Sequence, residues 1–145
     1  MATPSTIHRE MIDVIAHRDL ARFRNLLHPE YTYTGADGVE HAGPDAGVAV
    51  AEMYLAAFPD LEFEIRSVYT QGETAIAEFV CRGTHTGELL GMAPTGKRMQ
   101  LVVCNVIEVR DGMSYREREY YDALSMLVQL GLVTLPAKAA TASNV

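Results

Sequence analysis

Residues 99–121, MQLVVCNVIEVRDGMSYREREYY, carry the strongest signal of the fold. The first half of this stretch is rich in Val and Ile, residues that favour strands. Asp111-Gly112 follows, and this dipeptide between two strand-like segments is a strong signal for a hairpin turn. The stretch therefore predicts two antiparallel strands, over residues 99–110 and 114–121.

Strand patterns continue upstream as far as residue 61. Residues 61–65 read Leu-Glu-Phe-Glu-Ile, an alternation typical of a half-buried strand. Residues 74–82 predict another strand, and Gln71-Gly72 occupies the position of the turn before it. The four segments from residue 61 onward predict an antiparallel meander, and residues 31–34 predict one more short strand.

Apolar residues recur at helical spacing on both sides of the meander. A first helix is expected around residues 7–15, with Ser5 or Thr6 as its cap. A second short helix begins at Asp19 and ends at His28-Pro29, because the residue before a proline disfavours helical backbone. The other two predicted helices cover residues 44–57 and 122–130.

This order of elements predicts an α+β domain with its helices on one face of a curved, mainly antiparallel sheet. Such a cone encloses a pocket between the sheet and the helices. We expect one domain over residues 1–135. Residues 136–145 are small and polar, which predicts a disordered C-terminal tail.

The composition excludes several classes of protein. The chain has 145 residues and a formal net charge of −7, from 12 Lys and Arg against 19 Asp and Glu. An acidic chain is poorly suited to nucleic acid or an anionic membrane surface, and no run approaches the ~20 apolar residues of a membrane span. The N-terminus lacks a signal-peptide pattern. Cys81 and Cys104 are expected to be reduced core residues, so we predict a cytoplasmic protein.

Several short motifs occur in the order and at the spacing of one known family. They are Phe58-Pro59-Asp60-Leu61, residues 83–87 (GTHTG), residues 91–97 (GMAPTGK), Asp111-Gly112, Asp122 and residues 129–131 (QLG). With them, residues 5–135 resemble the SnoaL-like polyketide cyclases of the nuclear-transport-factor-2-like superfamily. The resemblance implies the same α+β cone and a homodimer or higher homo-oligomer formed through the open sheet face. Val102 and Val106, on the outer face expected for their strand, are consistent with such a contact.

The resemblance also implies a mechanism without a metal or an organic cofactor. In these cyclases a carboxylate on the last strand removes a proton α to a carbonyl, and the enolate closes a ring by intramolecular aldol addition. That carboxylate lies seven residues after the glycine of the Asp-Gly turn, which makes it Glu119 here in place of the family's Asp. A histidine that binds the ligand lies seven residues before the same glycine, and this position is Asn105 here.

The strand pattern supports the same carboxylate independently. Alternate residues of a strand share a face, so Glu117, Glu119 and Tyr121 point to one side. If that side faces the pocket, burial raises the pKa of Glu119 towards the working pH of a general base, and the second carboxylate raises a pKa further. The alternative is an exposed edge strand, in which Arg-Glu-Arg-Glu places charges in water on both faces.

Four further residues are candidates for binding a substrate, each with a structural alternative. His85 stands between two glycines and binds either a substrate oxygen or a neighbouring carbonyl group. Tyr33 and Tyr54 suit an aromatic ligand but also suit a core. Asp122 either reaches the pocket or caps the last helix. The histidines show no metal-ligand spacing, so we expect no metal.

We therefore expect a cofactor-independent enzyme that closes a ring in a hydrophobic, carbonyl-rich small molecule. Glu119 acts as the base, while Asn105 and either His85 or a tyrosine stabilise the enolate. Two alternatives are compatible with the same fold. One is an isomerase, dehydratase or epoxide hydrolase, and the other is a small-molecule-binding protein without catalysis.

Overall fold

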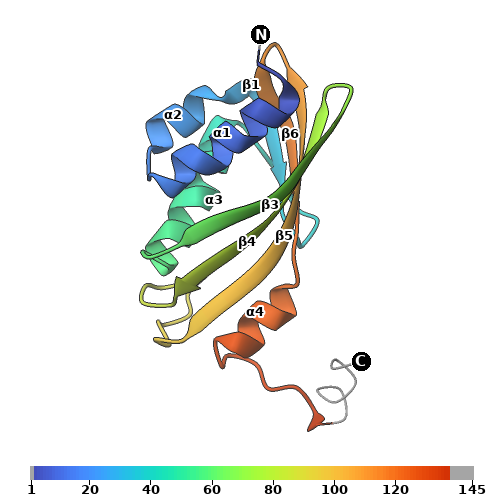
Figure 1. The fold of residues 1–145 in the computed structure, drawn as a ribbon. Helices are drawn as coiled ribbons and strands as arrows, with labels where there is room; N and C mark the ends of the chain where they lie inside the picture. Colours follow the sequence, from blue (N-terminus) through green and yellow to red (C-terminus); the bar gives the residue numbers. More distant parts are fainter. Residues whose placement is uncertain (1, 138–145) are drawn as a thin grey trace.

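A curved sheet, with the first helices on its concave side and the last helix at one end, forms the body of the structure, a computed structural model that describes residues 2–137 (Figure 1). Within these residues the helices are α1 (Pro4–Ala16), α2 (Leu20–Asn25), α3 (Pro44–Ala57) and α4 (Ala123–Gln129). The strands are β1 (Leu27–Thr34), β2 (Glu40–Ala42), β3 (Glu62–Gln71), β4 (Thr74–Thr84), β5 (Arg98–Arg110) and β6 (Met113–Tyr120). Residues 138–145, most of the tail that we expected to be disordered, lie outside the described residues.

The strands of residues 2–137 form one open, mixed sheet in the order β2-β1-β6-β5-β4-β3. From β3 to β6 each strand pairs antiparallel with the next, so the predicted meander and the predicted α+β cone are confirmed. The meander is not the whole sheet, however, because β1 pairs parallel with β6 and β2 pairs antiparallel with β1. Parallel partners distant in sequence share no turn, so local patterns do not predict their pairing.

The β5–β6 hairpin sets the register of the concave face. Asp111 and Gly112 both have positive φ, 53° and 72°, as a two-residue type I′ turn requires. The turn pairs Arg110 with Met113, and the register then shifts by one residue between Glu108 and Val109, so that Asn105 of β5 lies opposite Glu119 of β6. The expected hairpin is confirmed, and it brings these two side chains together on the side of the sheet that the helices cover.

Helices α1 and α3 both begin at a proline, where the missing N–H would have no helical partner in any case. The Thr3 hydroxyl caps α1 by accepting a hydrogen bond from the Thr6 N–H, so the helix begins before the expected caps Ser5 and Thr6. Helix α3 covers residues 44–57 as predicted.

Strand β1 begins earlier than predicted, at Leu27, and contains His28 and Pro29. Its pairing with β6 is irregular between Leu27 and Thr32, and Pro29 lies in this irregular part, outside the regular ladder. A proline fits a strand at such a point because it has no N–H to contribute to the ladder. The helix therefore stops before residue 28, as expected, but the chain continues as strand rather than loop.

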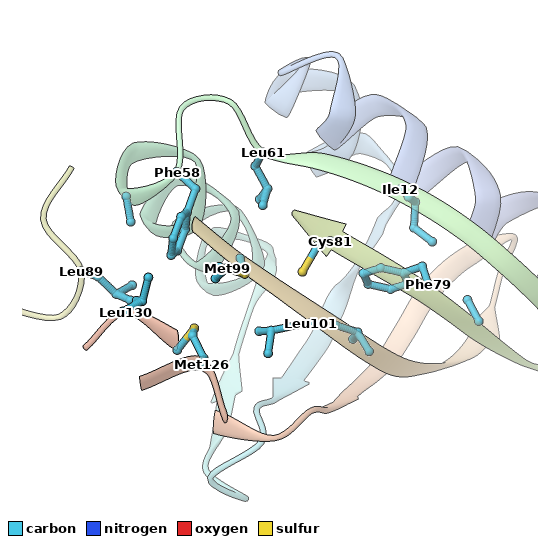
Figure 2. Close-up of a cluster of buried hydrophobic side chains, with 13 residues drawn as sticks. Ile12, Phe58, Leu61, Phe79, Cys81, Leu89, Met99, Leu101, Met126 and Leu130 are labelled. Carbon is cyan, nitrogen blue, oxygen red and sulfur yellow. The ribbon is translucent and has the colours of Figure 1, made fainter. Parts of the chain in front are cut away.

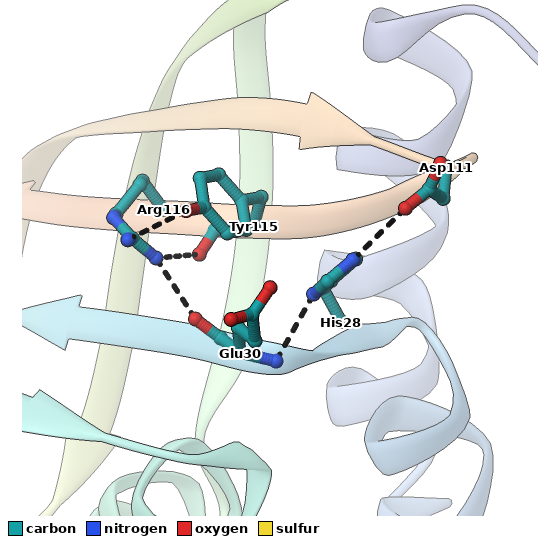
Figure 3. A network of polar contacts seen from close by, with 5 residues as sticks. All are labelled: His28, Glu30, Asp111, Tyr115 and Arg116. Atoms are coloured by element: carbon teal, nitrogen blue, oxygen red, sulfur yellow. Dashed lines mark hydrogen bonds and ion pairs between the residues drawn. The ribbon is translucent and has the colours of Figure 1, made fainter.

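Side chains join β1 to the hairpin where the ladder is interrupted (Figure 3). His28 accepts a hydrogen bond from the Glu30 N–H at Nδ1, so its Nε2–H donates to Asp111 at 3.1 Å. Arg116 donates to the Glu30 carbonyl oxygen at 2.8 Å and lies over the Tyr115 ring. These contacts hold the start of β1 beside β6, and the end of β1 carries tyrosines of the site described below.

Buried apolar side chains fill the space between the helices and the sheet. One cluster joins the end of α3 to α4 and the neighbouring strands, with Phe58, Leu89, Met99, Met126 and Leu130 among its members (Figure 2). A second cluster packs α1, α2 and β1 against the sheet, through residues such as Ile7, Met11, Phe23, Leu27 and Ile107. Burial of each such side chain contributes about 1.5–3 kcal/mol, which is what fixes the helices over the concave face.

The convex face of the sheet carries exposed apolar side chains, among them Val102 at 54% exposure. Cys81 is buried on the concave side as expected. Cys104 was expected in the core as well but is only half-buried, because it alternates with Asn105 and points to the convex side. Both thiols are free. Among residues 2–137, no helix has the length and apolar character needed to cross a membrane.

Candidate functional site

A cavity lies between the helices and the concave face of the sheet. It encloses about 700 Å³ of empty space, part of which is open to solvent. Most of its lining is apolar, from side chains such as Ile15, Phe23, Val50, Phe79, Leu101 and Val103. Its polar groups are few and come from Tyr31, Tyr33, Tyr54, Glu117, Glu119 and Tyr121. An apolar pocket with a few convergent polar groups is the usual form of a small-molecule site.

A smaller cavity, with about 360 Å³ of empty space, reaches the same two carboxylates from the side of α1. His8, Met11 and Asn105 line it and do not line the larger cavity. In residues 2–137 neither cavity is lined by a Lys or an Arg. The described residues also contain no cluster of three or more His, Cys, Asp or Glu side chains that could hold a metal ion.

The side-chain amide of Asn105 bridges two carboxylates. Its Nδ2 donates to Glu117 Oε2 at 2.8 Å and to Glu119 Oε2 at 2.9 Å. Glu117 is buried, with 9% of its surface exposed, whereas Glu119 is half-buried. Glu119 therefore keeps the access that a group reacting with a substrate needs, and Glu117 lies behind it.

Two tyrosines of β1 donate to the other oxygens of this pair. The Tyr31 hydroxyl donates to Glu117 Oε1 at 2.6 Å, and the Tyr33 hydroxyl donates to Glu119 Oε1 at 3.2 Å. Gly47 of α3 makes room for Tyr31, since a Cβ at that glycine would lie 2.8 Å from the Tyr31 ring. The parallel pairing of β1 with β6 is thus what brings the phenols to the carboxylates.

The surroundings make Glu119 a weaker acid than an exposed carboxyl group. Burial and the neighbouring charge of Glu117 raise the pKa of Glu119 to about 7, although hydrogen bonds from Asn105 and Tyr33 act to lower it. Burial also raises the pKa of Glu117, against hydrogen bonds from Tyr31 and Asn105. A carboxylate with a pKa near neutrality is suited to act as both base and acid.

His8 belongs to this site, although no expectation from the sequence included it. Its Nε2 lies 2.7 Å from Asn105 Oδ1, and the residue is 1% exposed. Burial lowers the pKa of His8 to about 4, so its ring is neutral near pH 7. One sequence signal was available: His8 stands beside Ile7 and three residues before Met11, on the buried stripe of α1.

Tyr54 of α3 and Tyr121, just after β6, meet across the larger cavity. Their hydroxyl oxygens are 2.5 Å apart, and both rings are half-buried. Burial raises the pKa of both phenols, so both remain neutral hydroxyl groups. One donates to the other, which leaves the second O–H able to donate to a ligand. These hydroxyls face the same cavity as Glu119, together with the Tyr33 hydroxyl.

His85 and Asp122, both candidates from the sequence, lie away from the two cavities. His85 is fully buried, where its Nδ1 lies 3.1 Å from the Thr95 hydroxyl and its ring packs on Phe58. Asp122 is exposed and caps α4 by accepting from the Ser125 N–H at 3.1 Å. Neither side chain is among the residues that line the cavities. Asp122 makes the capping contact of its structural alternative, whereas the His85 ring contacts the hydroxyl and the N–H of Thr95 and not the carbonyl group that its alternative expected.

The contacts of Asn105 differ from the expected role of stabilising the enolate. Both carboxylates take hydrogen bonds from its amide nitrogen, so the amide holds the pair and is not free to donate to an enolate. The hydroxyls of Tyr31 and Tyr33 also donate to the two carboxylates, so the remaining donor on the cavity wall is the second O–H of the Tyr54–Tyr121 pair. The arrangement provides a carboxylate that can exchange a proton near neutral pH, in an apolar cavity with neutral donors around it.

Comparisons with known proteins identify the family. The family model described as SnoaL-like polyketide cyclase matches residues 5–130. Aklanonic acid methyl ester cyclase DnrD of Streptomyces peucetius is 27% identical over 141 residues, which cover 90% of this chain and 92% of that protein. Nogalonic acid methyl ester cyclase of Streptomyces nogalater is 30% identical over 108 residues, covering 72% of this chain and 80% of that protein.

Solved structures agree with this fold. AclR of Streptomyces galilaeus, a candidate hydroxylase, is 25% identical with a TM-score of 0.82, over 97% of this chain and 89% of that one. IdmH of Streptomyces antibioticus, a candidate polyketide cyclase, is 25% identical with a TM-score of 0.78, over 90% of this chain and 99% of that one. The resemblance noted in the sequence is thereby confirmed, and the chain belongs to the family of SnoaL-like polyketide cyclases.

Proposed function

We propose that this cyclase closes a ring by an intramolecular aldol addition in which Glu119 transfers the proton, without a cofactor. The observation that carries the proposal is a half-buried carboxylate with a pKa raised to about 7 on the wall of an apolar cavity. Such a group removes a proton α to a carbonyl at neutral pH and can return it later in the reaction.

The atoms balance without a redox partner. The Glu119 carboxylate takes the α-proton, and the electron pair of that C–H bond becomes the enolate. The enolate carbon then forms a carbon–carbon bond to a second carbonyl of the same molecule, whose oxygen becomes an alkoxide. Protonation of that alkoxide by the Glu119 carboxylic acid gives the β-hydroxy ketone and regenerates the base.

The paired hydroxyls of Tyr54 and Tyr121 supply the donor that we assign to the enolate oxygen, because one of them donates to the other and the second O–H is left for a ligand. They are neutral donors on the wall that also carries Glu119. Preorganised donors of this kind stabilise a developing negative charge more strongly in an apolar cavity than in water. His85 and Asp122 have no part in this assignment, since their contacts lie elsewhere.

The lining favours a neutral, hydrophobic substrate. The described cavity walls hold two carboxylates, and their histidine has a pKa lowered to about 4, so no positive charge is available for a free carboxylate. A buried anion without a partner is costly. Two relatives are named as cyclases of methyl esters, whose acid group is masked, and an aromatic polyketide methyl ester is the substrate class that we propose here.

The test is α-proton exchange in deuterated water, followed by mass. Aklanonic and nogalonic acid methyl esters and simpler β-keto esters serve as probes. Wild type is compared with Glu119→Gln and with the matched control Glu78→Gln, whose side chain is exposed on the convex face. We expect exchange and a cyclised product from wild type and the control, and neither from Glu119→Gln.

Three outcomes would contradict the proposal. Turnover retained in Glu119→Gln would show that Glu119 is not the catalytic base. Exchange without ring closure across the panel would indicate an isomerase on the same fold. Tight binding of an aromatic probe with no chemistry in any variant would indicate a binding protein.

We also infer that two copies associate through the convex sheet face and that the protein is cytoplasmic. Tyr69, Val102 and Tyr120 are 54–59% exposed on strands of the sheet, and burying such side chains favours association. Two free thiols support a reducing compartment. Val102→Glu should convert a dimer into a monomer in sedimentation analysis, and a monomeric wild type would contradict the association.

A further inference from the structure

The contact between His8 and Asn105 is a buried polar pair that the proposed reaction does not use. His8 comes from α1 and Asn105 from β5, 97 residues apart in the sequence. Both residues are almost fully buried, at 1% and 4% exposure. An apolar side chain would be expected at such a buried position of α1. The presence of a histidine there, hydrogen-bonded to Asn105, therefore suggests a role beyond packing.

The two carboxylates determine which way the Asn105 amide must point. A carboxylate accepts hydrogen bonds and cannot donate them while it is ionised. With the amide reversed, its carbonyl oxygen would lie within 3 Å of both carboxylates, where it meets oxygen instead of a donor. The NH₂ group must therefore face Glu117 and Glu119, and the carbonyl oxygen must face α1.

The orientation of the amide in turn fixes the tautomer of His8. Asn105 Oδ1 is an acceptor, so the His8 nitrogen at 2.7 Å from it carries the proton. His8 Nδ1 then holds a lone pair and has no hydrogen-bond partner in the described residues. In the other tautomer two lone pairs would face each other at 2.7 Å, and a buried N–H would lack an acceptor.

We propose that His8 is a positioning residue for the catalytic base: its Nε2–H holds the Asn105 amide oxygen, and this keeps both amide N–H groups on the carboxylates of Glu117 and Glu119. The chain of contacts runs from α1 through β5 to β6, and each link is a donor meeting an acceptor. The consequence for catalysis rests on the proposed function of Glu119, whereas the orientation of the amide does not.

Other titratable groups also act on Glu119 and remain in place when His8 is changed. They surround it on several elements, namely Glu117 and Tyr121 from β6 and its end, Tyr31 and Tyr33 from β1, Tyr54 from α3 and Cys81 from β4. The hydrogen bond from Asn105 lowers the pKa of Glu119, so weakening it should raise that pKa.

The first experiment needs no substrate. The Glu119 side-chain carboxyl is titrated by ¹³C NMR in wild type, His8→Leu and His8→Gln. Leucine fills the space without a donor, whereas the glutamine amide nitrogen lies as many bonds from Cα as His8 Nε2 and can donate to Asn105. His28→Gln is the control, because this histidine is also buried but contacts Asp111 at the far end of the hairpin.

We expect the pKa of Glu119 to rise by about one pH unit in His8→Leu, the size of one weakened hydrogen bond. It should stay near the wild-type value in His8→Gln and in the control. An unchanged pKa in a folded His8→Leu would overturn the proposal. If His8→Leu does not fold, ¹⁵N shifts of the wild-type His8 ring decide the question, since a proton on Nδ1 in place of Nε2 would overturn it as well.

The second experiment separates positioning from general damage. At pH 7, a one-unit rise in the pKa of Glu119 lowers the ionised fraction from about half to about one tenth, so α-proton exchange should fall about fivefold in His8→Leu. Raising the pH to 9 should restore the rate, whereas a damaged site would stay slow at every pH. If wild type shows no α-proton exchange, the proposed function is contradicted. The NMR titration of Glu119 would still test the role of His8, because it needs no substrate.

Discussion

Asn105 and Glu119 lie directly opposite each other in the β5–β6 hairpin, and the amide of one donates to the carboxylate of the other at 2.9 Å. The resemblance to the family implied a ligand-binding histidine at position 105. In this chain that position is Asn105, and the imidazole of His8 approaches it from α1, so that Asn105 lies between the imidazole and the carboxylates.

The rate of the reaction should depend on pH through the ionisation of Glu119. The base must be ionised to take a proton, and its pKa is raised to about 7 by burial and by Glu117. We therefore expect kcat/KM for exchange to rise tenfold per pH unit below pH 7 and to level off above it. A pH–rate profile from pH 5 to 9 checks this, and a rate independent of pH below 6 would contradict it.

Replacing Glu117 by Gln should move that profile to lower pH. The negative charge of Glu117 raises the pKa of Glu119, so an uncharged amide makes Glu119 easier to ionise. Activity at pH 5.5 should then rise relative to the plateau rate of the same variant. The matched control is Glu108→Gln, which removes a charge from the convex side of β5, where Glu108 pairs with Arg118. A shift of equal size in both variants would contradict the assignment.

Glu119→Gln should stabilise the fold increasingly as the pH rises. The folded pKa of Glu119 is raised from 4.5 to about 7, so the native state binds more protons than the unfolded state in that window. The contribution of Glu119 to stability is thus present below pH 4.5 and is lost towards pH 7. Glutamine does not titrate, so the variant does not lose this stability. The free energy of unfolding of Glu119→Gln should therefore rise relative to that of wild type by about 3 kcal/mol between pH 4.5 and pH 8.

The lowered pKa of His8 makes the free energy of unfolding depend on pH in the opposite sense. The effect of Glu119 must therefore be measured as the difference between Glu119→Gln and wild type, because His8 is present in both proteins. Its folded pKa is lowered from 6.5 to about 4, so the unfolded state binds more protons between these values and stability rises with pH. In wild type the two slopes oppose each other between pH 4.5 and 6.5. Urea unfolding of both proteins at several pH values measures the difference, and a constant offset would contradict the raised pKa.

Asp122→Ala should cost stability and leave the chemistry intact. The Asp122 carboxylate caps α4 through the Ser125 N–H and lies outside both cavities. Loss of such a cap costs about 1 kcal/mol of unfolding free energy. Denaturant unfolding should show that loss, while kcat/KM for exchange remains within twofold of wild type. A tenfold fall in kcat/KM for a folded Asp122→Ala would restore the pocket interpretation of this residue.

Much of the fold could be predicted from local patterns. The turn at Asp111-Gly112 requires positive φ at two residues, and its neighbours alternate, so the hairpin follows from the sequence alone. Helix α3 is bounded by prolines at 44 and 59, and its predicted ends are those observed. The strand period also places Glu117 and Glu119 on one face, which the cavity lining agrees with.

Local patterns did not predict how β1 joins the sheet or which residues bond to Glu117 and Glu119. Nothing in the sequence near residue 31 indicates that β1 pairs parallel with β6, yet this pairing supplies Tyr31 and Tyr33 to the site. For His85 between two glycines, the sequence left a substrate oxygen and a neighbouring carbonyl group as alternatives, and its neighbours in space are Thr95 and Phe58.

Local patterns in the sequence predict the hairpin, the helices and the family, and they place Glu117 and Glu119 on one face, because period, turns and motifs are properties of neighbouring residues. That Asn105 bridges two carboxylates and that His8, 97 residues earlier, contacts its amide is visible in the folded structure alone. Contacts at this separation depend on how a helix packs on a sheet, and no spacing along the chain records that geometry.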